Sequence, residues 1–166
     1  MRGLTAFIVT LMIMVVSAAA DERPVNDRLR TLLSDRHYHA SEEAVKELGP
    51  DVNAALKEIA GDESEPIFRR VRAVSALGYF DDDETSLFLE NIARANGRLV
   101  AIRWAALRSL ARSKGNDSVE LISGYLKDDN RFTRRVAGNS LQTIGSEKAL
   151  RLLGEARREG YIPDSP

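Results

Sequence analysis

Hydrophobic residues recur along residues 50–160 at intervals of three and four, the interval at which side chains share one face of an α-helix. In the clearest stretches, an arginine is followed by an alanine three positions later and by a leucine seven positions later. The stretches are "RRVRAVSALGYF" at 69–80, "IRWAALRSLARS" at 102–113 and "TRRVAGNSLQTI" at 133–144. They predict three helices that bury the same stripe.

The three stretches align on Arg70, Arg103 and Arg134, which are 33 and then 31 residues apart. A recurrence of this length predicts one structural unit per repeat. The arginines flank the stripe, so we expect them to bond carbonyls or acidic groups of the adjoining turn. The aligned stripe residues are Ala73, Ala106 and Ala137, with Leu77, Leu110 and Leu141.

A further amphipathic stretch precedes each of these helices, so the chain reads as a series of helix pairs. No single pair can bury its own stripe, whereas stacked pairs bury them all. A four-helix bundle is the alternative, but it does not require the second helix of each pair to match residue for residue. The preceding stretches are 50–66, 83–97 and 116–130, with a last helix at 146–160 and a weaker pair at 25–35 and 41–49.

The pattern R-x-x-A-x-x-x-L, followed by small residues, resembles HEAT repeats, especially the short bacterial HEAT-like type also found in phycobilisome lyases. The resemblance covers 50–160 well and 25–49 loosely. It implies an all-α, right-handed α-solenoid of about three to four HEAT-like helix pairs. HEAT repeats often carry an aspartate before the arginine. Here Glu65 and either Asp128 or Asp129 stand in that place, but Arg98 has the wrong charge.

The first residues have the pattern of a secretory signal. One positive charge at Arg2 precedes an apolar run over 4–16, and small residues lead to Ala20. We therefore predict a signal peptide at 1–20, N-terminal helices forming a degenerate repeat at 21–49, a HEAT-like repeat domain at 50–160 and a tail at 161–166. An uncleaved anchor is the alternative, although the run of about 13 residues is short for a bilayer. We expect an extracytoplasmic protein, periplasmic or secreted, without stable membrane insertion after cleavage.

Charge and cysteine content narrow the class of protein. The chain has 24 Lys and Arg against 25 Asp and Glu, for a net charge of −1, and no cysteine. This balance argues against binding to nucleic acid or to anionic membranes. Without disulfides, stability outside the cytoplasm depends on burial alone.

Candidate catalytic and metal sites are few. His37 and His39 lie near Glu42 and Glu43, but an H-x-H pair converges only in extended backbone and no third ligand follows at a diagnostic spacing. The acidic run at 81–84 lacks the spacing of a calcium loop, so helix capping is the preferred interpretation. We expect no enzyme activity, no cofactor and no metal. A lyase-like enzyme, which the resemblance allows, is the less favoured alternative.

The helical period also defines the face opposite the buried stripe. Tryptophan, tyrosine and arginine on this face are typical of binding hot spots, and the arginine fork suits carboxylates. HEAT-like proteins usually present second helices on their concave side, so the resemblance implies a groove there. We predict partner binding by Tyr79, Trp104, Arg108, Arg112, Arg135 and Asn139.

The predicted function is a scaffold or adaptor for another extracytoplasmic protein or peptide, with an acidic partner favoured. A self-assembling structural subunit is the alternative. For the face itself, the alternative is that Trp104 packs against a neighbouring helix and the arginines are ordinary solvated charges.

Overall fold

The computed structural model describes residues 24–37, 41–95 and 99–163, and every regular element in these ranges is helical. The predicted signal peptide, His39 and Arg98 lie outside the described residues. The α-helices are α1 (Val25–Ser34), α2 (Glu42–Lys46), α3 (Val52–Gly61), α4 (Ile67–Leu77), α5 (Asp83–Arg94), α6 (Val100–Ser113), α7 (Val119–Ser123), α8 (Arg131–Ile144) and α9 (Glu147–Arg158), and 3₁₀ turns η1 (Gly115–Ser118) and η2 (Gly124–Lys127) flank α7.

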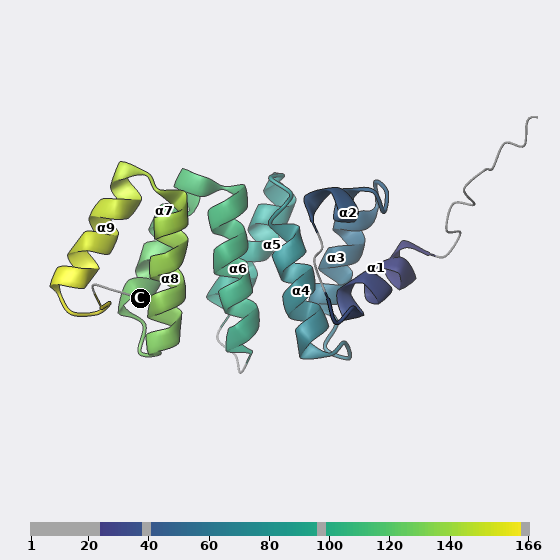
Figure 1. Cartoon of the computed structure of the whole chain (residues 1–166), viewed down its shortest axis with the longest axis horizontal. Coiled ribbons are helices and arrows are strands. Elements are labelled where there is room, and N and C mark those ends of the chain that lie inside the picture. The colour runs from purple at the N-terminus through teal and green to yellow at the C-terminus, as the bar shows by residue number, and fades with distance from the viewer. Residues whose placement is uncertain (1–23, 38–40, 96–98, 164–166) are drawn as a thin grey trace, which may run out of the picture.

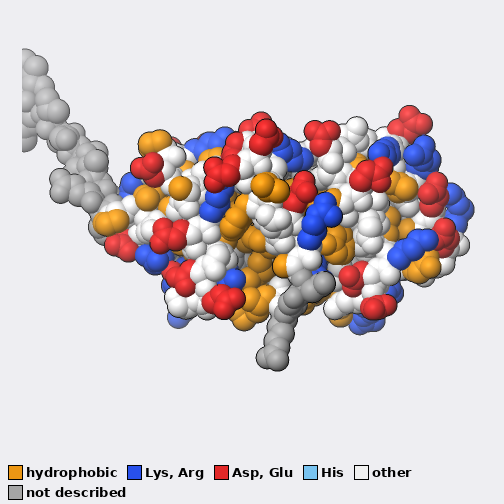
Figure 2. Space-filling model, turned by 180° about the vertical axis from the view of Figure 1, so that it is seen from behind, with side chains coloured by type: hydrophobic (Ala, Val, Ile, Leu, Met, Phe, Trp, Pro, Cys, Tyr) orange, Lys and Arg blue, Asp and Glu red, His pale blue; other side chains and the backbone are white. Residues whose placement is uncertain are grey.

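The helices form antiparallel pairs that stack in one direction, as a helical solenoid does (Figure 1). α3 packs on α4, α5 on α6 and α7 on α8, while α4 contacts α6 and α6 contacts α8. α1 packs on α3 and α4 at one end, and α9 packs on α7 and α8 at the other. The second helices of the pairs therefore form one layer. The first helices form the other layer, and Figure 2 shows acidic and basic side chains interspersed over that side.

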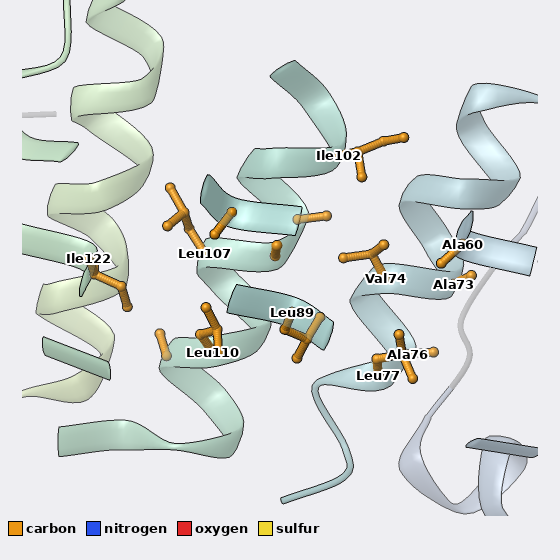
Figure 3. Packing of buried hydrophobic residues seen from close by; sticks show 14 of the residues in the cluster. Ala60, Ala73, Val74, Ala76, Leu77, Leu89, Ile102, Leu107, Leu110 and Ile122 are labelled. Atoms are coloured by element: carbon orange, nitrogen blue, oxygen red, sulfur yellow. The ribbon is translucent and has the colours of Figure 1, made fainter. Parts of the chain in front are cut away.

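The core follows the predicted stripe. The three aligned alanines and three aligned leucines are all at most 1% exposed. The first helices also bury one equivalent residue in each repeat. These residues, which stand 33 positions apart and are fully buried, are Leu56, Leu89 and Ile122. Figure 3 shows Leu89, Leu110 and their neighbours pointing into the space between helices. Burying each such side chain contributes about 1.5–3 kcal/mol, so the stacked repeats stabilise one another.

Two glycines allow close approach between packed elements. A Cβ atom built on Gly78 would lie 2.9 Å from the Cα of Ser109, so α4 and α6 meet there through backbone. A Cβ on Gly138 would lie 3.0 Å from Cδ1 of Ile162 and 3.3 Å from Cδ1 of Leu153. The glycine inside α8 thus faces a side chain of α9 and one of the segment that follows it.

Two predicted helices are shorter than expected. The stretch 116–130 is not one helix but a 3₁₀ turn, the five-residue α7 and a second 3₁₀ turn. Gly124, a weak helix former, stands where α7 ends. At 41–49 only α2 is helical, and its buried residue is Val45.

The acidic run at 81–84 caps a helix, as expected. Asp82 caps α5, because its carboxylate accepts a hydrogen bond from the backbone N–H of Thr85 at 2.8 Å. Asp51 precedes α3 without a capping side-chain bond. Within the described residues, no helix combines the length and the apolar character needed to cross a membrane.

Candidate functional site: the arginine face of α4, α6 and α8

Positive charge is segregated onto the second helices of the pairs. α4, α6 and α8 together carry nine arginines and no aspartate, glutamate or lysine. The first helices are different, since α5 contains three carboxylates and one arginine. A chain with nearly balanced charge therefore presents one layer of helices on which every formal charge is positive.

Three of these arginines connect the two helices of their own pair. The Nε of Arg70 donates to the carbonyl of Ala60 at 3.0 Å, and the Nη2 of Arg103 donates to the carbonyl of Ala95 at 2.6 Å. Arg134 donates from Nη1 to the carbonyl of Asp128 at 2.8 Å. Each bond returns to the end of the preceding first helix. The prediction that the repeated arginines bond the adjoining turn is confirmed.

Among the described residues, no acidic side chain pairs with Arg70 or Arg134 in the way expected from the aspartate that HEAT repeats often carry before the arginine. Glu65 pairs with Arg30 at 2.6 Å and with Arg69, not with Arg70. Arg134 bonds the main-chain carbonyls of Asp128 and Asp129 instead of their carboxylates.

Exposed arginines on this layer lie over aromatic rings. The guanidinium carbon of Arg112 on α6 is 4.8 Å from the ring centroid of Tyr79, just after α4. On α8, Arg131 and Arg135 lie 4.7 and 5.2 Å from the ring centroid of Phe132. Such cation–π contacts hold the guanidinium plane in place while its edge remains able to donate hydrogen bonds.

Trp104 is only partly available to a partner. It is half-buried, and its indole N–H donates to the hydroxyl of Thr133 on α8 at 2.9 Å. Its ring centroid lies 6.2 Å from that of Phe132, with the rings tilted by 49°. Trp104 therefore does pack against the neighbouring helix, as the alternative interpretation held.

Phe132 is an exposed aromatic residue beside Trp104 and Arg135 that the sequence interpretation missed. Its side chain is 39% exposed and lies three and seven residues before Arg135 and Asn139, on the same helical stripe. The same periodicity that selected Arg135 could have selected it.

Arg108 has no internal partner. It is exposed on α6 and makes no hydrogen bond, ion pair or ring contact with any residue that the structure describes. Partial desolvation by the surrounding helices lowers the pKa of its guanidinium, and the nearby charge of Arg112 lowers that pKa further. Arginine stays protonated at physiological pH, so a partly desolvated positive charge lies close to a second one here. An incoming carboxylate would relieve the repulsion between them.

Comparison with known families agrees with this geometry. The family model of HEAT repeats matches residues 90–161. The matched part of the chain consists of HEAT repeats. The matched range includes all of α6, α8 and α9, so two of the three helices of this layer belong to the HEAT repeats directly. No curated protein and no solved structure matches the chain.

The six predicted residues lie on one layer of the helical solenoid. Tyr79 and Trp104 are half-buried there, while the other four are exposed. We call this surface the arginine face and define it by the predicted residues together with Phe132. Its members are Tyr79, Trp104, Arg108, Arg112, Phe132, Arg135 and Asn139.

The residues that the structure describes include no assembled metal site, and His39 lies outside them. His37 is exposed, and no group of three or more His, Cys, Asp or Glu residues is gathered among the described residues. No carboxylate, histidine or cysteine belongs to the arginine face, whose chemistry is therefore that of hydrogen-bond donation and cation–π contact.

Proposed function

We propose that this HEAT-repeat protein is an exported, non-enzymatic scaffold that binds an acidic segment of another extracytoplasmic protein on its arginine face. The observation that carries the proposal is the absence of any carboxylate from α4, α6 and α8, which leaves Arg108 and Arg135 without acidic partners among the described residues. HEAT repeats generally serve as protein-interaction scaffolds, which supports the same conclusion. Export rests on the signal-like pattern of residues 1–20.

The spacing of the helices specifies the acidic partner. Packed helices lie about 8–10 Å apart, and an extended chain advances about 3.3–3.6 Å per residue. A segment that crosses α6 and α8 therefore meets a new set of arginines at about every third residue. The best partner is an extended segment with carboxylates at this interval and an aromatic or aliphatic residue that contacts Phe132.

We further propose that about three to four pairs wind into a right-handed solenoid with the second helices on the concave side. A concave arginine face would surround the segment and desolvate its ion pairs, which strengthens them relative to pairs on an open surface.

The test uses a synthetic peptide of about twelve residues with aspartate at every third position, and fluorescence anisotropy as the readout. The double variant Arg108→Glu/Arg135→Glu should weaken binding by at least about tenfold, because two attractive pairs become repulsive. The control Arg94→Glu/Arg151→Glu makes the same charge change at exposed positions on α5 and α9 and should bind as the unchanged chain does.

A peptide of the same composition with its aspartates in one block tests the spacing. Tighter binding of the spaced peptide supports an extended segment across the helices. Equal loss of affinity in both double variants would contradict the proposal, because binding would then follow net charge alone.

A further inference from the structure

A cavity of about 620 Å³ opens between the first two full helix pairs, at the end where α4 and α6 begin. Figure 2 shows hydrophobic side chains gathered at the surface on this side of the molecule, towards the lower edge of the view. The walls are mainly apolar, and two guanidinium groups contribute the positive charge. The residues that matter for its chemistry are Ile67, Phe88, Ile92, Ile102, Arg70 and Arg103.

One residue distinguishes this interface from the next one along the solenoid. Tyr125 stands 33 residues after Ile92, in the same register of the following repeat. Its hydroxyl crosses to the preceding repeat and donates to the carbonyl of Ala93 at 2.6 Å. Ile92 is too short to make the equivalent contact with Ala60, which lines the cavity. Helices that pack on each other normally leave little space between them. The space between these two repeats is therefore unusual.

The two arginines keep hydrogen-bond donors available at this cavity. Arg70 donates only from Nε, to the carbonyl of Ala60 at 3.0 Å, so both of its Nη groups lack a partner among the described residues. Arg103 donates from Nη2 to the carbonyl of Ala95 at 2.6 Å, and its Nε is buried without a partner. An Nη1/Nη2 edge such as that of Arg70 can bind a carboxylate with two parallel hydrogen bonds.

The acidic residues that line the cavity do not neutralise the positive charge of Arg70 and Arg103. The carboxylate of Glu65 is held by Arg30 and Arg69, whose hydrogen bonds outweigh the effect of burial and keep its pKa below the usual value. Glu63 also lines the cavity, but it is exposed to solvent. The cavity thus combines apolar walls with two guanidiniums, the solvated carboxylate of Glu63 and the ion-paired carboxylate of Glu65.

We infer that this cavity binds a small amphipathic carboxylate, a molecule with an apolar body and one carboxylate group. The apolar body would lie against Ile67, Phe88 and Ile92, and the carboxylate would pair with the Nη edge of Arg70. The volume lies within the range of about 300–1,000 Å³ that is usual for small-molecule sites. This site is separate from the arginine face and does not depend on the proposed scaffold function.

The test titrates the full chain with decanoate and with decanol and follows the isoleucine methyl groups by NMR. Decanoate should shift the methyl signals of Ile67, Ile92 and Ile102 in a saturable way. The signals of Ile122 and Ile144, which do not line the cavity, should stay in place. Decanol should bind at least about tenfold more weakly, because it cannot form the charged pair.

The variant Ile92→Tyr copies the next repeat and should fill the cavity. It should weaken decanoate binding at least about tenfold without lowering the melting temperature. Arg70→Gln should remove the preference for decanoate over decanol. Decanoate binding that persists unchanged in a folded Ile92→Tyr protein would overturn the inference. If that variant does not fold, shifts confined to other isoleucines of the unchanged chain would overturn it equally.

Discussion

At the scale of single residues, position within the repeat decides what an arginine does. Arg134 makes hydrogen bonds from Nε to the carbonyl of Tyr161 at 2.8 Å and from Nη1 to that of Asp128 at 2.8 Å. Arg135, the next residue, is exposed and only lies over Phe132. Neighbouring arginines on one helix thus divide between holding the fold and facing solvent.

This division predicts different stability effects for two adjacent substitutions. Arg134→Met should lower the free energy of unfolding by about 1–3 kcal/mol, because it leaves main-chain acceptors without donors. Arg135→Met should change it by less than about 0.5 kcal/mol, as is usual for exposed positions. Urea denaturation of both variants measures the difference. Equal losses would contradict the structural role of the repeated arginine.

At the scale of elements, the distance between α4 and α6 depends on Gly78. A methyl group there would meet the backbone of Ser109, which cannot rotate away as a flexible side chain can. Gly78→Ala should therefore destabilise the protein by about 1–3 kcal/mol through overpacking.

Gly154 provides the matched control, since the nearest atom to a Cβ built there is Nη1 of Arg158 at 3.7 Å. Gly154→Ala inside α9 should stabilise by about 0.5–1 kcal/mol, because alanine is the better helix former. Thermal unfolding of both variants is the measurement. A stabilising effect of Gly78→Ala would show that the two helices are less closely packed than described.

The contact of α1 with α4 depends on an ion pair that responds to pH. Burial would raise the pKa of Glu65, but hydrogen bonds with Arg30 on α1 and Arg69 on α4 outweigh it and lower the pKa. A carboxylate with a lowered pKa in the folded state adds stability above its unfolded pKa of about 4.3, and this contribution is lost as the pH falls through the folded value.

Glu65→Gln should therefore be less stable than the unchanged chain at pH 7, and the difference should shrink as the pH falls below about 4. Urea denaturation across this pH range measures it, with Glu63→Gln as an exposed control. A difference that is constant with pH would show that the charge of Glu65 does not stabilise the fold.

Sequence periodicity predicted the buried stripes and the structural arginines because both recur in each repeat. It did not predict features that depend on contact between particular repeats. Trp104 is half-buried because α8 supplies Thr133 and Phe132, and Ile92 lines the cavity at the position where the next repeat has Tyr125. The hydrophobic pattern also did not predict that the stretch 116–130 would divide into α7 and two flanking 3₁₀ turns.

At the scale of the whole molecule, the net charge is nearly zero, but the positive and negative charges are unevenly distributed between the two layers of helices. The layer of α4, α6 and α8 carries only arginine as its charged residue, while the opposite layer mixes both signs. An asymmetric field of this kind would attract an acidic molecule from solution and orient it, and the attraction would weaken with ionic strength. The arginine face and the cavity lie on different parts of the solenoid, so each can be altered without the other.

The most direct test of the central claim is cross-linking from the arginine face in the native extracytoplasmic fraction. A photo-cross-linking amino acid replaces Asn139 on α8 or, as the control, exposed Asn91 on α5. The account predicts that only the Asn139 position captures another protein, through a segment rich in aspartate and glutamate, and that Arg108→Glu abolishes the capture. Cross-links from Asn139 to a second copy of this chain alone would contradict it and favour self-assembly.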